Sequence, residues 1–346
     1  MLARGLTERA AAGRPSILSS EVEKLLKDAD LRFGNLESPL AAIASPTRPR
    51  AFRAPITGAN FLTHFDVLSL ANNHVFDCGD DGIAETLGAL ASQGIRQVGV
   101  SEDPDRAYEP LLLATSAATL AVFGCTSRRN LRVPPGSRFT VPLAEDRRLD
   151  DAIRRAAGSA GFVVVLFHGG TEYVPYPPPS VRARLRQLSG LGANLIVTHH
   201  PHVLGGYETV GENVLIWYSL GDFVFDSRVP RRRRSGILSV EVNPPEIRSF
   251  RLVPTCAADD ATVLPADPGT SRKIEAGVDR VSRSLSSRWY RRGYPFRYVS
   301  AVTASQFERL VCTYRERGPR AALAFVLRRF LLAWRGAWNL LRGGRR

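Results

Sequence analysis

The sequence predicts an α/β fold in which short buried strands alternate with helices. Short runs rich in Val, Ile, Leu and Phe each end in polar or glycine-containing residues, a pattern typical of strands covered on both faces. Strands that alternate with helical segments favour an α/β sheet, in which ligands bind at the carboxyl ends of the strands. The predicted strands are residues 31–33, 67–70, 120–123, 162–167, 195–197 and 214–218.

Helical patterns fill the segments between these strands. Ser20 and Glu23 match a capping box at the start of the first helix. Apolar residues keep helical spacing within 83–90, and residues 150–157 and 181–191 are further predicted helices.

Patterning divides the 346 residues into three segments. Residues 1–255 carry every predicted strand and form the expected compact domain. Residues 256–319 are weakly patterned and are expected to form a connecting region, apart from a helix within 272–287. Residues 320–346 are predicted to form a basic amphipathic helix.

The predicted C-terminal helix has an apolar face beside a stripe of arginines. Leu331, Trp334, Trp338 and Leu341 share that face. Such a helix can lie in a membrane interface, and it is too charged to span a bilayer. A helix that docks on the domain with solvated arginines is the alternative.

The formal net charge of +14 favours anionic partners such as phosphorylated substrates, acidic polymers or acidic lipids. A run of arginines at 231–234 either steers such a ligand or forms a solvated hairpin tip. Nucleic acid is not an expected partner, because the basic runs are not interleaved with aromatics near a recognisable binding module.

The N-terminal residues and the cysteines bear on location and redox chemistry. The four cysteines have no paired spacing, so neither a thiolate zinc site nor a disulfide framework is predicted. No apolar segment typical of a signal peptide opens the chain. The expected location is therefore membrane-associated or cytoplasmic. Met1 is the only methionine, so a truncated start is an alternative.

Histidines gather directly after the predicted strands. Five of the six lie there, with His64 taken as structural, and carboxylate and amide side chains accompany them. Histidine, amide and carboxylate ligands suit Zn²⁺, Mn²⁺ or Fe²⁺. His200 and His202 stand two residues apart, so in extended backbone they can face neighbouring ions, which suits a two-metal centre. The candidate residues are Asn35, Glu37, Asn73, His74, His168, Glu172, His199, His200, His202 and Asp222.

Each of these motifs alone also has a structural interpretation. His168 could be a hydrogen-bonded structural histidine, Glu37 a cap, and Asn73 part of a turn. A shared metal site explains all of them together, and a metal would lower the pKa of bound water to about 7 and so provide a nucleophile.

The ordered motifs resemble the CapA capsule-synthesis family over about residues 30–225. The resemblance implies a calcineurin-like metallophosphoesterase sandwich with α/β/β/α layers, followed here by a C-terminal helical extension. The strings that carry it are residues 35–39, 52–55, 69–74 with Asp77 and Gly79, 168–173, 199–202 and 218–223.

The resemblance also implies roles for the candidate residues. Asn73 would be the amide ligand, and His74 would contact the substrate oxyanion, so these two are the predicted catalytic residues. His200 and His202 would be the closing ligand pair and His168 an isolated ligand. Glu37 would stand where the phosphoesterases have a bridging carboxylate.

The sequence departs from the family pattern at two places. The family's opening strand, which ends in Gly-Asp and supplies a first carboxylate ligand, is not found before Asp30. A truncated start or a degenerate, non-catalytic member would explain this. Asp222 stands where the family usually has Asn, which adds negative charge beside the metals.

Two functions follow from the resemblance. The first is a metal-dependent hydrolase that uses a metal-bound hydroxide and serves synthesis of poly-γ-glutamate or another anionic cell-surface polymer. The second is a non-catalytic accessory subunit that works with the membrane proteins of polymer synthesis. A shared fold does not decide between them.

Overall fold

The computed structural model describes residues 16–42, 52–211, 213–225, 227 and 229–343, with side chains described up to 326. The chain forms two compact units, residues 1–294 and 295–346. The first unit contains all the described strands and every described candidate site residue.

A six-stranded sheet forms the centre of the first unit, in the order β4-β5-β6-β7-β9-β8. Its inner strands are parallel, and β4 and β8 pair antiparallel at the edges. Every residue of β6 is buried, as expected for a strand covered on both faces. The strands are β4 Leu111–Ala114, β5 Thr119–Thr126, β6 Phe162–His168, β7 Leu195–His199, β8 Tyr207–Thr209 and β9 Leu215–Trp217.

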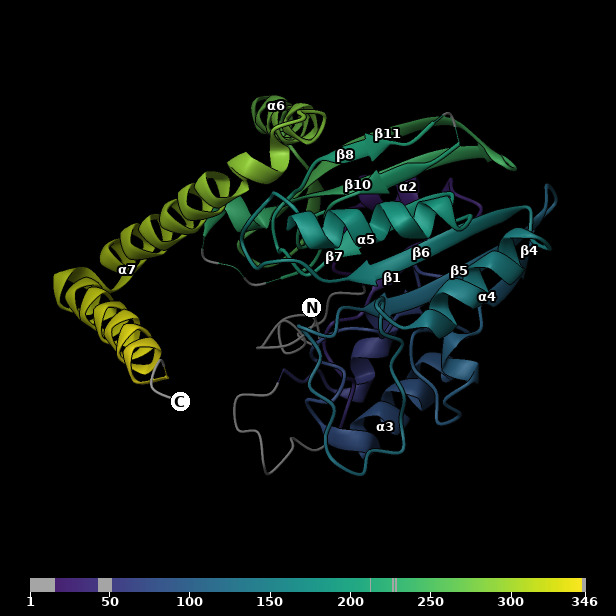
Figure 1. The fold of residues 1–346 in the computed structure, drawn as a ribbon, viewed down its shortest axis with the longest axis horizontal. Coiled ribbons are helices and arrows are strands. Elements are labelled where there is room, and N and C mark those ends of the chain that lie inside the picture. Colours follow the sequence, from purple (N-terminus) through teal and green to yellow (C-terminus); the bar gives the residue numbers. More distant parts are fainter. Residues whose placement is uncertain (1–15, 43–51, 212, 226, 228, 344–346) are drawn as a thin grey trace. The chain divides into compact units, whose positions relative to one another are not determined.

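Helices α4 (Arg147–Ala157) and α5 (Pro179–Gly190) cover one face of this sheet (Figure 1). Leu149 and Ile153 of α4 are fully buried in the same apolar cluster as Leu185 of α5. Their spacing of four residues on α4 places both side chains on one face of that helix.

A parallel three-stranded sheet, β1-β2-β3, packs against the other face. Gly124 of β5 allows this close approach, because an added Cβ would lie 3.0 Å from Ser69 Oγ and from Val98. Helix α3 covers the outer side of the small sheet, so the predicted α/β/β/α order is confirmed. The elements are β1 Phe33–Asn35, β2 Val67–Ser69, β3 Arg96–Val98 and α3 Gly79–Ser92.

The first helix begins one residue earlier than its predicted capping box. Helix α2 spans Ser20–Lys27, and Ser19, not Ser20, is the N-cap. Ser19 has extended backbone, and its Oγ accepts a hydrogen bond from the Val22 N–H at 3.4 Å.

The compact unit continues beyond residue 255, where the sequence predicted a connecting region. Strands β10 (Arg234–Asn243) and β11 (Glu246–Ala257) form a long hairpin, to which β12 (Val263–Pro265) is added. Helix α6 (Pro268–Leu285) packs beside it through Ile274 and Val278, which contact the buried Trp217.

Helix α7 (Tyr290–Gly343) is the last element of the described residues. Non-helical backbone at Gly318, followed by Pro319, kinks it. Its first half falls in the segment predicted to be weakly patterned. Among the helices of the described residues, none is long and apolar enough to cross a membrane. The predicted apolar face from Leu331 onward lies outside the described side chains.

The turn after β3 supports the turn that carries the candidate ligand Asn73. Gly99 has φ +91°, and a Cβ there would lie 2.5 Å from Ala71 Cβ. We expect Gly99→Ala to destabilise the fold by about 3 kcal/mol, through left-handed strain and overpacking. Urea unfolding monitored by circular dichroism would measure this loss.

Gly94→Ala is the matched control, because Gly94 has φ +70° but nothing within 4 Å of the added Cβ. This substitution should destabilise the fold through left-handed strain alone, by about 1 kcal/mol. Equal losses in the two variants would contradict the proposed support of the Asn73 turn.

Candidate metal centre

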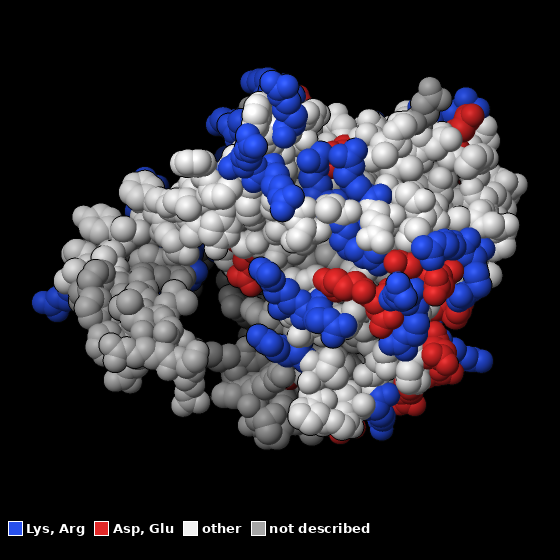
Figure 2. All heavy atoms as spheres, viewed as in Figure 1, with Lys and Arg blue, Asp and Glu red and all other residues white. Residues whose placement is uncertain are grey.

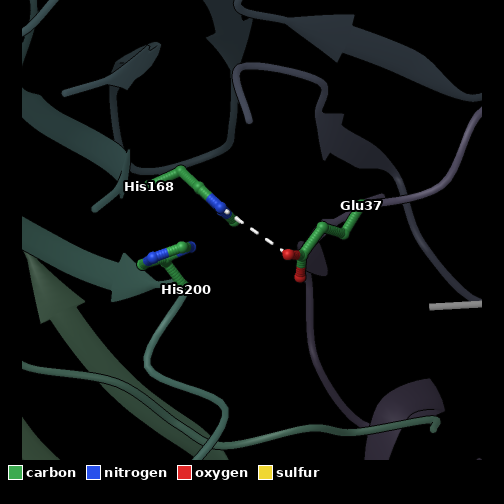
Figure 3. Close-up of side chains that lie close together, drawn as sticks. All are labelled: Glu37, His168 and His200. Atoms are coloured by element: carbon green, nitrogen blue, oxygen red, sulfur yellow. Dashed lines mark ion pairs between the residues drawn. The ribbon is translucent and has the colours of Figure 1, made fainter. Parts of the chain in front are cut away.

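The ends of four parallel strands bring the candidate ligands together. Glu37 follows β1, Asn73 follows β2, His168 ends β6, and His200 follows β7. Glu37, His168 and His200 are buried, and one ligand atom from each lies within 4.8 Å of the others. Figure 3 shows the three side chains pointing toward one another.

Glu37 lies between two imidazoles. Its Oε1 is 3.7 Å from His168 Nε2 and 3.6 Å from His202 Nε2. His168 Nε2 also lies 2.7 Å from Asn73 Oδ1. The carboxylate, amide and imidazole groups therefore form one compact donor set, which is a combination that suits borderline divalent cations.

Several buried polar atoms of this cluster lack a hydrogen-bond partner among the described residues. They include Glu37 Oε1, Asn35 Oδ1, His200 Nδ1 and Asp222 Oδ2. A buried polar atom without a partner costs about 1–3 kcal/mol. Coordination of a cation would satisfy lone pairs on these atoms, so the residues present fit a divalent metal.

Burial sets the protonation of the imidazoles. It lowers the pKa of His168 well below the usual value and that of His200 to about 3, with a smaller contribution from His202. Both are neutral near pH 7, which is the form that binds metals. Burial also raises the pKa of the Glu37 carboxyl.

His202 differs from its neighbours. Burial acts to lower its pKa, but Glu37 and Asp222 outweigh burial and raise the pKa to about 9. Asp222 Oδ1 lies 2.7 Å from His202 Nδ1. Asp222 therefore orients this imidazole and leaves Nε2 toward Glu37, as carboxylates do for metal-binding histidines.

Backbone strain concentrates at the same turns. His200 has φ +98°, His202 has φ +56° and Ser219 has φ +97°. Such left-handed conformations of non-glycine residues cost about 1–3 kcal/mol each and cluster at functional sites.

His74 is held at the edge of the cluster. Its Nδ1 lies 2.8 Å from Asp77 Oδ2, and its backbone N–H donates to Asn72 Oδ1 at 3.0 Å. Asn72 Nδ2 in turn donates to Leu36 O at 2.8 Å, which ties this turn to the Glu37 loop. The imidazole is thus oriented while remaining partly exposed.

A cavity of about 180 Å³, with both polar and apolar lining residues, extends from the cluster. Phe33 and Leu68 are among its apolar lining residues. Asn73, His74, His168 and Glu172 are not part of this lining. Glu172 is exposed and acts on His202 through its charge. The predicted site residues that line the cavity are Asn35, Glu37, His199, His200, His202 and Asp222.

Sequence reasoning missed Asn130. Its Nδ2 lies 2.8 Å from His200 Nε2, while Ser127 Oγ donates to Asn130 Oδ1 at 2.7 Å. Asn130 lies in the loop after β5, the same kind of position as the predicted ligands. The rule that polar residues follow strands could therefore have found it.

The interpretation of the arginine run as a solvated hairpin tip is wrong for Arg232. This side chain is buried, and its Cζ lies 3.5 Å from the centroid of the Tyr173 ring. Stacking on an aromatic face makes burial of a guanidinium tolerable. The hairpin turns instead at the cis Pro244–Pro245 bond, between β10 and β11.

The layered fold and the donor set at its strand ends define a metallophosphoesterase-like α/β protein. The family model of the bacterial capsule synthesis protein PGA_cap matches residues 1–227. The chain therefore belongs to this capsule-synthesis family.

Three known proteins illustrate the likeness. The capsule biosynthesis protein CapA of Bacillus anthracis is 28% identical over 77% of this chain and 66% of its own length. The PGA biosynthesis protein CapA of Bacillus subtilis is 34% identical over 55% of this chain and 50% of its own length. The chain thus spans between half and two thirds of these relatives. A putative 5′-nucleotidase from Staphylococcus aureus has a TM-score of 0.47 at 15% identity, over 75% of this chain and 51% of that one.

Asn130 should matter for metal affinity because it contacts a candidate ligand. We expect Asn130→Ala to weaken Mn²⁺ or Zn²⁺ binding about 10- to 100-fold, the usual effect of losing a group that orients a metal-binding histidine. Isothermal titration calorimetry would measure the dissociation constant. Asn243→Ala, at an exposed position of the hairpin, should leave it unchanged; equal affinities in both variants would refute the role of Asn130.

Proposed function

We propose that this protein is a metal-dependent hydrolase acting on a phosphoester, or on an amide, of an anionic cell-surface polymer such as poly-γ-glutamate. The observation that carries this proposal is the set of buried, unpartnered donor atoms gathered at the strand ends. Family membership supports the polymer context.

The proposed ligands are Glu37, Asn73, His168, His200 and His202, holding one or two ions of Mn²⁺, Zn²⁺ or Fe²⁺. A divalent cation there would supply Lewis acidity and make water nucleophilic near neutral pH. Glu37, placed between His168 and His202, would contribute the anionic donor.

His74 is the proposed group that faces the substrate. Its Nδ1 is engaged by Asp77, so Nε2 is left to donate to a substrate oxygen on which negative charge develops. Its partial exposure, in contrast with the buried His168, suits contact with a bound substrate.

Replacing a buried ligand tests this proposal. We expect His200→Ala to abolish Mn²⁺- or Zn²⁺-dependent hydrolysis of bis(4-nitrophenyl) phosphate and to reduce the bound metal measured by mass spectrometry, because it removes a buried neutral imidazole from the donor set.

His64→Ala is the matched control, since His64 lies 3.6 Å from Glu23 and outside the cluster. It should keep both properties. Full metal content and turnover in His200→Ala would contradict the proposed centre.

A non-catalytic accessory role is the second candidate. It is favoured by the composition of the candidate metal cluster. Within the described residues, the group of Glu37, His168 and His200 contains one carboxylate, that of Glu37. A protein that binds metal and polymer but shows no turnover with any divalent ion would support this role over hydrolysis.

A membrane surface and the membrane proteins of polymer synthesis are further proposed partners, through the basic segment 320–346. The full chain should sediment with vesicles containing anionic lipid more strongly than with neutral vesicles, because arginines are attracted to anionic headgroups. A chain ending at residue 319 should lose this difference. Equal sedimentation with both vesicle types would contradict membrane association.

A further inference from the structure

A second cavity, of about 460 Å³, lies beside the candidate metal centre. The loop after β5 contributes Ser127, Arg129 and Asn130 to its lining, and the first turn of α4 contributes Arg147. Thr171, three residues after the ligand His168, also lines it.

Asn130 connects this cavity to the centre. It lines the cavity and at the same time contacts His200 at 2.8 Å. The backbone N–H of Ser127, whose side chain holds Asn130, also donates to the His168 carbonyl at 3.1 Å. A ligand in the cavity would therefore lie next to the side chains proposed to hold the metal.

The charges that line the cavity are not equally available. Asp150 is paired with Arg184, which also donates to Ala144 O at 2.6 Å. Glu145 accepts a hydrogen bond from the Arg128 backbone N–H at 3.0 Å.

Arg129 and Arg147 are exposed, and neither side chain has a hydrogen bond or ion pair among the described residues. Cationic groups are therefore free to bind a ligand where both carboxylates are already engaged.

The position of Arg147 is unfavourable for the helix that carries it. It is the first residue of α4, and a cation in the first turn opposes the helix dipole. Its neighbour Arg148 is compensated by Asp146 at 2.9 Å, but Arg147 is not. Residues that oppose local helix preferences in this way are expected at functional sites. Figure 2 shows that basic side chains also gather over α5 and α6 on this face.

We propose that this cavity binds carboxylate groups of an anionic polymer, next to the bond held at the metal centre. Arg129 and Arg147 would bind the carboxylates, and the Thr171 hydroxyl would donate a further hydrogen bond. This inference rests on the proposed function, since it assigns the substrate class of the same centre. A polymer with one carboxylate per repeat would engage the centre and the cavity together.

Binding of a fluorescein-labelled γ-glutamyl decamer to the metal-loaded full-length protein tests the proposal. The double variant Arg129→Gln/Arg147→Gln should bind it about tenfold more weakly in fluorescence anisotropy, a change equivalent to about 1.4 kcal/mol. Free glutamate should compete poorly. Inorganic phosphate that competes as well as the unlabelled decamer would show a phosphate site and overturn the assignment to a carboxylate polymer.

Arg251→Gln/Arg280→Gln is the matched control, because it removes two exposed arginines that do not line the cavity. Its affinity should equal that of the wild type. Equal weakening in both double variants would show a general charge effect and overturn the proposal. Unchanged affinity in Arg129→Gln/Arg147→Gln would overturn it too, as would a wild type that does not bind the decamer. The single variants, checked by circular dichroism, exclude loss of fold as the cause.

Turnover of bis(4-nitrophenyl) phosphate by the wild type tests hydrolysis separately. If decamer binding depends on Arg129 and Arg147 but the protein shows no turnover, the polymer-binding cavity is supported and the proposed hydrolase activity is contradicted. If the protein shows turnover but decamer binding does not depend on either arginine, the hydrolase activity is supported and the polymer-binding cavity is contradicted.

Discussion

The buried carboxylate of Glu37 is the constraint on which the centre depends. Its Oε1 lies within 3.7 Å of imidazole nitrogens of His168, which ends β6, and of His202, in the turn after β7, and the side chain is buried. A buried carboxylate must be paired, protonated or bound to a metal. The parallel strand ends, the strained turn at His200 and the tie between Asn72 and Leu36 all serve to bring donors to this one group.

Much of this arrangement could be predicted from the sequence. The buried strand β6 ends in His168, and the apolar run before His200 gives β7, because doubly covered strands leave a clear apolar signal. The rule that ligands gather at parallel strand ends then placed Glu37, Asn73 and the histidines near one another.

Other features could not be predicted, because they depend on tertiary contacts that leave no local sequence pattern. The Ser19 cap differs from the predicted Ser20 by one position, which is within the range where helix ends are ambiguous. The position of Asn130 after β5 could have been predicted, but its contact with His200, 70 residues away in the sequence, could not. Arg232 is buried with its guanidinium against the ring face of Tyr173. The helix predicted within residues 272–287 is α6, but its packing against Trp217 could not be predicted from any local pattern.

In the proposed centre, Glu37, Asn73 and His168, together with His200 and His202, hold a divalent cation. Anomalous X-ray diffraction from crystals grown with Mn²⁺ tests it most directly. We expect an anomalous peak in contact with Glu37 Oε1, Asn73 Oδ1 and His168 Nε2, because a bound cation would replace the 2.7 Å contact between Asn73 and His168. Crystals that keep this contact and show no peak among the three residues would contradict it.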